Sequence, residues 1–145
     1  MSFMNALEIA ASGLAASRTR MNVTAANVAN ANTTRGADGG PYKRQDPVLQ
    51  AVPVAQPFGQ MLRDRLSASL RGVQVTGVVQ DQRAPRQVYD PSHPDADARG
   101  MVAMPNVNLV EEMVDMITAS RAYEAGVTTI QTLKSMANKA LSIGR

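Results

Sequence analysis

The single histidine of the chain, His93, has two aspartates close behind it, Asp95 and Asp97. Imidazole and carboxylate groups at such spacing can together hold a zinc ion or another divalent metal. The chain offers no second histidine and no cysteine, however, and Pro91 and Pro94 make the segment a turn-rich loop. We therefore interpret these residues as part of a solvated loop, and we predict no metal site and no cofactor.

A second acidic group, Glu111, Glu112 and Asp115, has the side chains that general acid–base catalysis uses. It stands at the expected start of a helix, where carboxylates interact favourably with the helix dipole, and Asn108 with Glu111 resembles a capping box. We interpret the three carboxylates as dipole and capping partners. No phosphate-binding glycine loop accompanies them, because GADGGP lacks the following Lys-Ser/Thr. We predict no catalytic residue and no enzymatic activity.

The stretch MNVTAANVANANTT, residues 21–34, places asparagines and alanines at the end of an expected helix. Asparagine is a mediocre helix former. One interpretation is that Asn27 and Asn30 only end the helix, by satisfying local backbone groups. The other is that the small residues allow a neighbour to approach closely and that the two amides form hydrogen bonds to it. The residues alone leave both interpretations open.

Both ends of the chain have the periodicity of amphipathic helices, over residues 3–31 and 108–143. The apolar seams recur at heptad positions, and they consist of Leu7, Leu14, Met21 and Val28 in the first helix and Met113, Met116, Tyr123, Val127 and Ile130 in the second. Two helices with matching heptads can pair antiparallel. The first helix carries only three charged residues, so we expect partners to cover the apolar surface that the pair leaves exposed.

The residues between the two helices have strand character. YKRQDPVLQAVPV is interrupted by prolines, and GVQVTGVVQ alternates like a half-buried strand with RQVYDP as its expected partner. FGQMLRDRLSASL is an expected short helix, and MVAM is a short extended piece. Few large side chains are available here, so this region can form only a small β-rich module. We predict an α+β fold with three parts, residues 1–34, 35–104 and 105–145.

Composition excludes several classes of protein. The 145 residues suffice for one domain, and the net charge of +3 comes from scattered lysines and arginines, so we predict no nucleic-acid binding. No apolar run approaches the ~18 residues of a membrane span, so we predict no membrane insertion. The first residues lack the pattern of a secretory signal, and export would therefore leave the chain uncleaved.

Three stretches resemble one known family. ALEIAASGLAASRTRMNVTAANVANANTT resembles the N-terminal signature of the flagellar rod and hook family, and PNVNLVEEMVDMITASRAYEAGVTTIQTLKSMANKALSIG resembles its C-terminal helix. VYDPSHPDADARGMVAMPNVN is similar to the linker of the small, proximal-rod members, in which it runs directly into that helix. The short middle region differs from the larger inserts of the hook and distal rod members.

The resemblance implies a structural subunit of the proximal rod, part of the drive shaft that carries torque from the membrane ring to the hook. It also implies an inner layer of antiparallel coiled coils, with copies of the chain and other rod proteins as partners. Export would use the flagellar type III apparatus, with Phe3 and Leu7 as its short motif, and the chain would end in the periplasmic rod. With the resemblance, we favour subunit contacts for Asn27 and Asn30, together with the two seams.

A different class of protein also has these features. A helical adaptor, or a module that lies on a membrane surface, could use an amphipathic first helix. That helix carries only two basic residues, which argues against the membrane version.

Overall fold

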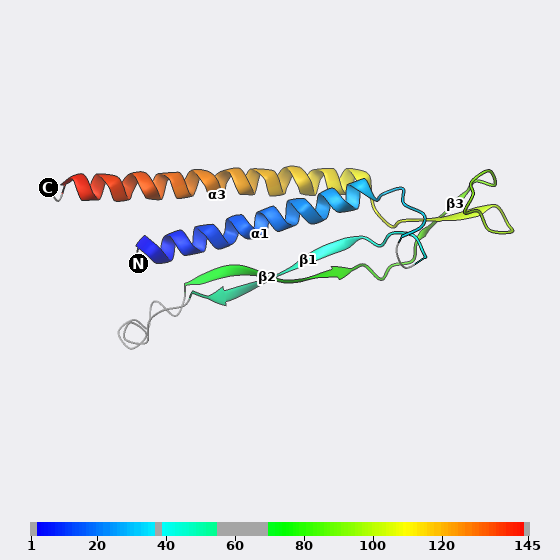
Figure 1. Ribbon diagram of the computed structural model, residues 1–145, viewed down its shortest axis with the longest axis horizontal. Coiled ribbons are helices and arrows are strands. Elements are labelled where there is room, and N and C mark those ends of the chain that lie inside the picture. Colours follow the sequence, from blue (N-terminus) through cyan, green and yellow to red (C-terminus); the bar gives the residue numbers. More distant parts are fainter. Residues whose placement is uncertain (1–2, 37–38, 55–69, 144–145) are drawn as a thin grey trace. The chain divides into compact units, whose positions relative to one another are not determined.

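The computed structural model describes residues 3–36, 39–54 and 70–143. Its elements follow one another as α1 (Phe3–Ala29), β1 (Gln45–Pro53), β2 (Arg71–Gln80), β3 (Arg86–Tyr89), β4 (Met101–Met104) and α3 (Leu109–Ile143) (Figure 1). The helix expected in FGQMLRDRLSASL lies outside the described residues, apart from its last one. No helix of the described part is long and apolar enough to cross a membrane.

Both terminal helices begin and end close to the predicted positions. Asn108 caps α3, because its Oδ1 accepts a hydrogen bond from the N–H of Val110 at 3.2 Å. Asn30 ends α1: its Nδ2 donates to the carbonyl of Ala26 at 2.9 Å, and its Oδ1 accepts from the hydroxyl of Thr33. The Asn108 bond satisfies an N–H that the start of a helix leaves without a partner, and the Asn30 bonds stay within the residues at the end of α1.

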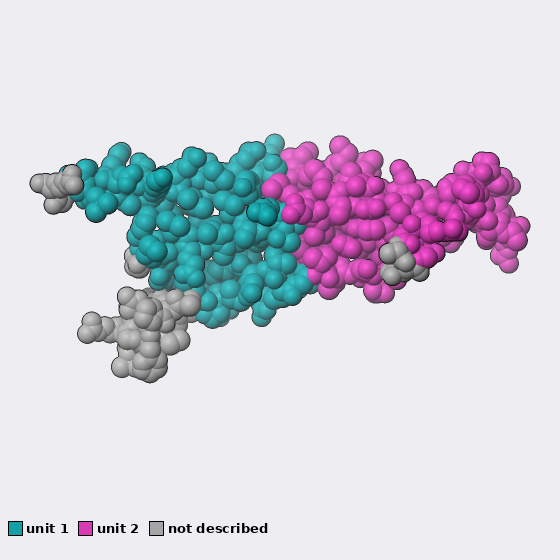
Figure 2. Space-filling model, in the orientation of Figure 1, with its two compact units in different colours: residues 1–19, 48–77, 119–145 teal, residues 20–47, 78–118 magenta. Residues whose placement is uncertain are grey.

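The chain divides into two compact units (Figure 2). Unit 1 consists of residues 1–19, 48–77 and 119–145, and unit 2 of residues 20–47 and 78–118. The predicted boundaries at 34/35 and 104/105 stay predictions, and both units draw residues from all three predicted parts.

Segments of α1 and α3 meet in each unit (Figure 1). In unit 1, a Cβ added at Gly126 would lie 3.6 Å from Cδ1 of Leu14. In unit 2, Nδ2 of Asn27 lies 2.9 Å from a carboxylate oxygen of Glu112. The contact with the higher residue number in α1 has the lower residue number in α3. The two helices therefore pair antiparallel. The predicted α+β fold with paired terminal helices is confirmed.

The strands form two separate two-stranded sheets, β1 with β2 and β3 with β4. The prediction that RQVYDP pairs with the preceding strand was wrong: β3 is antiparallel to β4, with Tyr89 opposite Met101. The connection between them returns the chain through Gly100, whose φ of +75° suits glycine. The alternating residues of β2 also form no buried face, since Val73, Val78 and Val79 are exposed.

The interior of the described chain is small and partly polar. Its buried apolar side chains are Ala16, Val23, Val102, Pro105 and Ala119. The largest fully buried side chains include Glu112 and Asn27, both in unit 2. Burial of such groups is costly unless each finds a partner, so the contacts that satisfy them identify what holds unit 2 together.

Candidate functional site

Four side chains in unit 2 form one connected group, which we call the polar cluster: Asn27, Tyr42, Arg44 and Glu112. They come from α1, from the residues just before β1, and from the first turn of α3. Asn27 and Glu112 are each 1% exposed. The cluster therefore ties together three segments that are distant in the sequence.

The amide of Asn27 uses all its hydrogen-bonding positions within the chain. Its Nδ2 donates to the carbonyl of Gln45 at 2.8 Å and to Glu112 at 2.9 Å. Its Oδ1 accepts from the N–H of Gln45 and from the hydroxyl of Tyr42, both at 2.9 Å. An amide has two N–H donors and two oxygen lone pairs. Asn27 thus bonds both the N–H and the carbonyl of Gln45, as the backbone of a neighbouring strand would. These two bonds fix the start of β1 against α1.

Within its own chain, the Asn27 amide is occupied by Gln45, Tyr42 and Glu112, and the expected contact of the two asparagines with a neighbouring subunit stays a prediction. The Asn30 amide likewise bonds to its own helix end. Both asparagines satisfy groups of their own chain, and only Asn30 does so in the way expected of a helix terminator.

Arg44 is the cation of the polar cluster. Its Nε donates to Glu112, and its terminal nitrogens pair with Asp46 and, at 3.8 Å, with Asp115. Burial acts to lower the pKa of the Arg44 guanidinium, but the hydrogen bond and the charge of Glu112 hold it above its ordinary value. Arg44 therefore stays charged, and removal of Glu112 would leave a largely buried cation with only partial compensation.

The phenol of Tyr42 completes the polar cluster. Burial, and then the negative charge of Glu112, raise the pKa of Tyr42 above its ordinary value of 10.0. Tyr42 is thus neutral at physiological pH and can donate its hydrogen bond to Asn27. All of these contacts are internal, so the arrangement is suited to fixing the register of α1, β1 and α3.

The structure corrects the interpretation of Glu112. It was expected to be a dipole and capping partner with Glu111 and Asp115, whereas it is buried against Arg44 and Asn27. The three-and-four spacing of Glu112 with the buried Ala119 and the half-buried Met116 and Tyr123 shows that it shares their inward face. An acid on that face requires a cation, and this signal was available in the sequence.

The residues considered for metal binding serve the connection between β3 and β4. Asp95 pairs with Arg35 at 2.7 Å and accepts a hydrogen bond from Thr34. Nδ1 of His93 accepts from the N–H of Asp95. Among the described residues, no group of three or more His, Cys, Asp or Glu side chains could hold a metal ion.

The predicted interface residues have different environments in the chain. Most are half-buried, namely Leu7, Leu14, Met21, Val28, Met116, Tyr123, Val127 and Ile130. Met113 is exposed, and so is Phe3 of the predicted export motif. In α1 the buried apolar side chains, Ala16 and Val23, lie beside the predicted seam rather than on it.

An apolar stripe lies exposed on the first part of α3 in unit 2. Its members are 48–70% exposed and share one side of the helix at three-and-four spacing, and we call the following set the α3 stripe: Leu109, Val110, Met113, Val114 and Ile117. Glu112, between them in sequence, points inward. The start of α3 therefore binds its own chain with polar groups and presents apolar groups to the outside.

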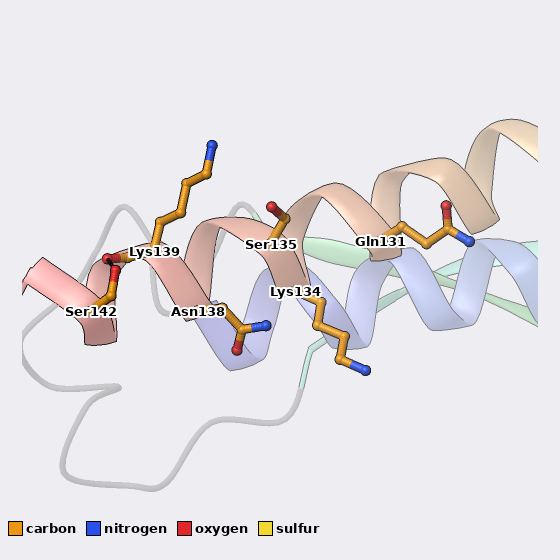
Figure 3. A pocket seen from close by; sticks show the side chains of 6 residues that line it. All are labelled: Gln131, Lys134, Ser135, Asn138, Lys139 and Ser142. Carbon is orange, nitrogen blue, oxygen red and sulfur yellow. Dashed lines mark hydrogen bonds between the residues drawn. The ribbon is translucent and has the colours of Figure 1, made fainter.

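The surface hollows of the described chain offer no enclosed site. One hollow in unit 1 is lined by polar residues of α3 alone, which project from that single helix (Figure 3): Gln131, Lys134, Ser135, Asn138, Lys139 and Ser142. A single helix cannot enclose a ligand on several sides, as a small-molecule site usually does. A second hollow, in unit 2, lies between the end of α1 and the start of α3.

Comparison with known proteins agrees with this structural arrangement. Residues 7–37 match the family model of the flagella basal body rod protein, and residues 98–143 match that of the flagellar basal body rod FlgEFG protein C-terminal region. The first match contains Asn27, and the second contains Glu112 and the α3 stripe.

Curated relatives match the chain over its full length. The flagellar basal-body rod protein FlgC of Borreliella burgdorferi is 45% identical, over 99% of this chain and 98% of that protein. The corresponding proteins of Salmonella typhimurium and Bacillus subtilis are 42% and 39% identical over the whole of both chains. None of these relatives supports the alternative of a helical adaptor or membrane-surface module. The chain belongs to the flagellar basal-body rod protein family and is a structural component of the rod.

Proposed function

We propose that this chain assembles into the rod through the α3 stripe, with copies of itself and other rod proteins as its partners. The observation that carries the proposal is the exposure of five apolar side chains on one side of a helix. Contiguous apolar surface of this kind is typical of protein–protein contacts. One such contact, repeated about an axis between different surfaces of the subunit, builds a helical assembly.

The polar cluster gives the proposed subunit its rigidity. A drive shaft must transmit torque without its helices sliding past one another. The Asn27–Glu112 hydrogen bond joins α1 directly to α3, and Asn27 and Glu112 both bind the residues at the start of β1. A shift of one helix by one residue would separate these buried polar groups, so the contacts define a single register. The role is structural and involves no catalysis. The resemblance of residues 88–108 supports a position in the proximal rod.

We also propose that the chain is exported by the flagellar type III apparatus and becomes part of the periplasmic portion of the basal body. Phe3 and Leu7 are the proposed export motif. Phe3 is exposed near the start of α1, so a receptor could bind it without unfolding the rest of the chain.

A charge placed in the α3 stripe tests assembly directly. Val114 is exposed, so Val114→Asp leaves the fold of the single chain intact but puts a carboxylate into the proposed contact. We expect normal export with few intact rods. Thr132→Asp is the matched control, since Thr132 is exposed on the same helix in unit 1, and it should leave rod numbers near normal. Secreted protein and intact basal bodies are counted separately, and normal rod numbers with Val114→Asp would contradict the proposal.

A further inference from the structure

Tyr89, the last residue of β3, is one of only five aromatic residues in the chain. Its side chain is 70% exposed to solvent. Tyrosine is among the residues that contribute most to protein–protein binding, because its ring buries a large area at small entropic cost. An exposed tyrosine on a well-ordered strand is therefore a candidate anchor for a partner.

The pairing of β3 with β4 holds the backbone at Tyr89 in place. Tyr89 lies opposite Met101 in the β3–β4 sheet, and the N–H of Asp90 donates to the carbonyl of Gly100 at 2.9 Å. The ring covers Gly100, where an added Cβ would come within 3.0 Å of Cε2 of Tyr89. Glycine at this position thus permits both the positive φ and the placement of the ring.

The connection that follows Tyr89 is also well ordered. Oδ1 of Asp90 accepts from the N–H and the hydroxyl of Ser92. Oδ1 of Asp97 accepts from the N–H groups of Arg99 and Met101. A side chain on such a hydrogen-bonded segment loses little further conformational entropy when it binds a partner.

The hollow of unit 2 has the size and lining to receive a phenol ring. It has a volume of about 730 Å³ and is lined by Val28, Ala31, Asn32, Arg86, Pro105, Asn106, Val107, Asn108 and Leu109. Five of these side chains are apolar, three carry amides that can bond to a hydroxyl, and Arg86 carries a guanidinium. Within the described residues, Nδ2 of Asn106, a residue of this lining, is buried without a hydrogen-bond partner.

Tyr89 cannot enter the hollow of its own chain from its place in β3. Arg86, at the other end of the same strand, lines the hollow. Residues three apart in a strand point to opposite faces, so the Tyr89 ring is directed away from the face on which Arg86 lies. The ring and the hollow are therefore two different surfaces of unit 2.

We propose that Tyr89 of one copy of this chain inserts into the unit 2 hollow of a second copy, with Arg86 of that copy against the ring. The guanidinium and an aromatic face attract each other. Because ring and hollow are different surfaces, the contact is heterologous and can repeat from copy to copy. This inference rests on the proposed assembly into a rod and names one of its contacts.

The absence of cysteine from the chain makes disulfide crosslinking a direct test. Two single-cysteine variants, Tyr89→Cys and Asn32→Cys, are expressed together, and basal bodies are isolated under mild oxidation. We expect a crosslinked dimer of the two variants. Arg99→Cys with Asn32→Cys is the matched control, because Arg99 is exposed in the same connection, and it should give at least about tenfold less dimer. Equal yields from the two pairs would overturn the proposal.

The identity of the partner is tested by replacing Tyr89 with the photoreactive residue p-benzoylphenylalanine. A crosslink to residues 28–32 or 105–109 of a second copy supports the proposal, and a crosslink to any other protein overturns it. Tyr89→Ala should reduce intact basal bodies by about tenfold, the order of effect of an interface anchor, and Tyr89→Phe should reduce them less. If Tyr89→Ala gives normal rods while Val114→Asp does not, this inference fails and the proposed assembly through α3 stands.

Discussion

The two units of the chain hold the same two helices together with different chemistry. In unit 2, a buried carboxylate, a guanidinium and an amide join α1, β1 and α3. In unit 1, small residues allow close approach: Gly72 of β2 lies against Ser12 of α1, and Gly126 of α3 lies against Leu14. Buried and charged partners specify one geometry. The small residues of unit 1, joined by an exposed hydrogen bond from the N–H of Val73 to Ser12, tolerate more adjustment. Unit 2 is thus built to fix the register, and unit 1 depends more on what surrounds it.

The largest effect should come from the ion pair of unit 2. Glu112→Gln removes the charge that compensates Arg44 while it keeps the shape of the side chain. We expect a loss of about 3 kcal/mol in the free energy of unfolding, the lower end of the cost of breaking a buried pair, since Asp46 and Asp115 still attract Arg44. Equilibrium denaturation followed by circular dichroism measures it. Glu111→Gln, at the exposed neighbouring position, should change stability by less than about 0.5 kcal/mol.

Asn27 and Asn30, at the C-terminal end of α1, should differ in how much they contribute to the free energy of unfolding. Asn27→Ser shortens the side chain, so it cannot reach both Gln45 and Glu112, and we expect a loss of about 2 kcal/mol from buried groups left unpaired. Asn30→Ser should cost less than about 1 kcal/mol, because serine can also satisfy a helix end. Equal effects of the two changes in the same denaturation experiment would mean that the polar cluster contributes no more than an ordinary helix terminus.

Two glycines of unit 1, Gly72 and Gly126, should respond in opposite directions to substitution by alanine. Gly72→Ala places a Cβ 2.9 Å from Oγ of Ser12, and we expect a loss of about 1–2 kcal/mol through overpacking. Gly126→Ala places its Cβ at an ordinary 3.6 Å from Leu14, and it should stabilise by about 0.5–1 kcal/mol because alanine favours the helix. Thermal unfolding of both variants tests the opposite signs. Because Oγ of Ser12 also accepts a hydrogen bond from the N–H of Val73, the comparison uses a double-mutant cycle. Gly72→Ala should cost less in a Ser12→Ala background than in the wild type, and an equal cost in both would mean that the close approach is not the cause.

The smallest expected effect on stability comes from the ionisation of Tyr42 at alkaline pH. The pKa of Tyr42 is raised by burial and by Glu112, so its neutral form is favoured in the folded state. Its contribution to stability is therefore complete below pH 10 and is lost as the pH rises through its folded pKa. We expect the wild type to lose more stability than Tyr42→Phe as the pH rises above about 10. Parallel pH profiles of the two proteins would show that the hydroxyl contributes nothing.

The helices were predictable from the sequence because their signals are local. The heptad spacing, Asn108 and Pro105 place α3 within a residue of its observed start. Strand pairing was predicted wrongly for RQVYDP, since the choice between β2 and β4 depends on the turn chemistry of the connection around Gly100. The polar cluster combines Asn27, Arg44 and Glu112 from three distant segments, and no spacing reveals that combination. An inward-facing glutamate could have indicated that a cation was needed, but not which one.

The central claim, that the polar cluster fixes unit 2 whereas unit 1 depends on its surroundings, is tested most directly by hydrogen–deuterium exchange on the dilute full-length protein. The claim predicts that residues 20–29 of α1 and 109–118 of α3 exchange more slowly than residues 3–19 and 119–143 of the same helices. Glu112→Gln should remove this difference, because it removes the contact that distinguishes the units. Equal protection along both helices in the wild type, or slower exchange in unit 1, would contradict the claim.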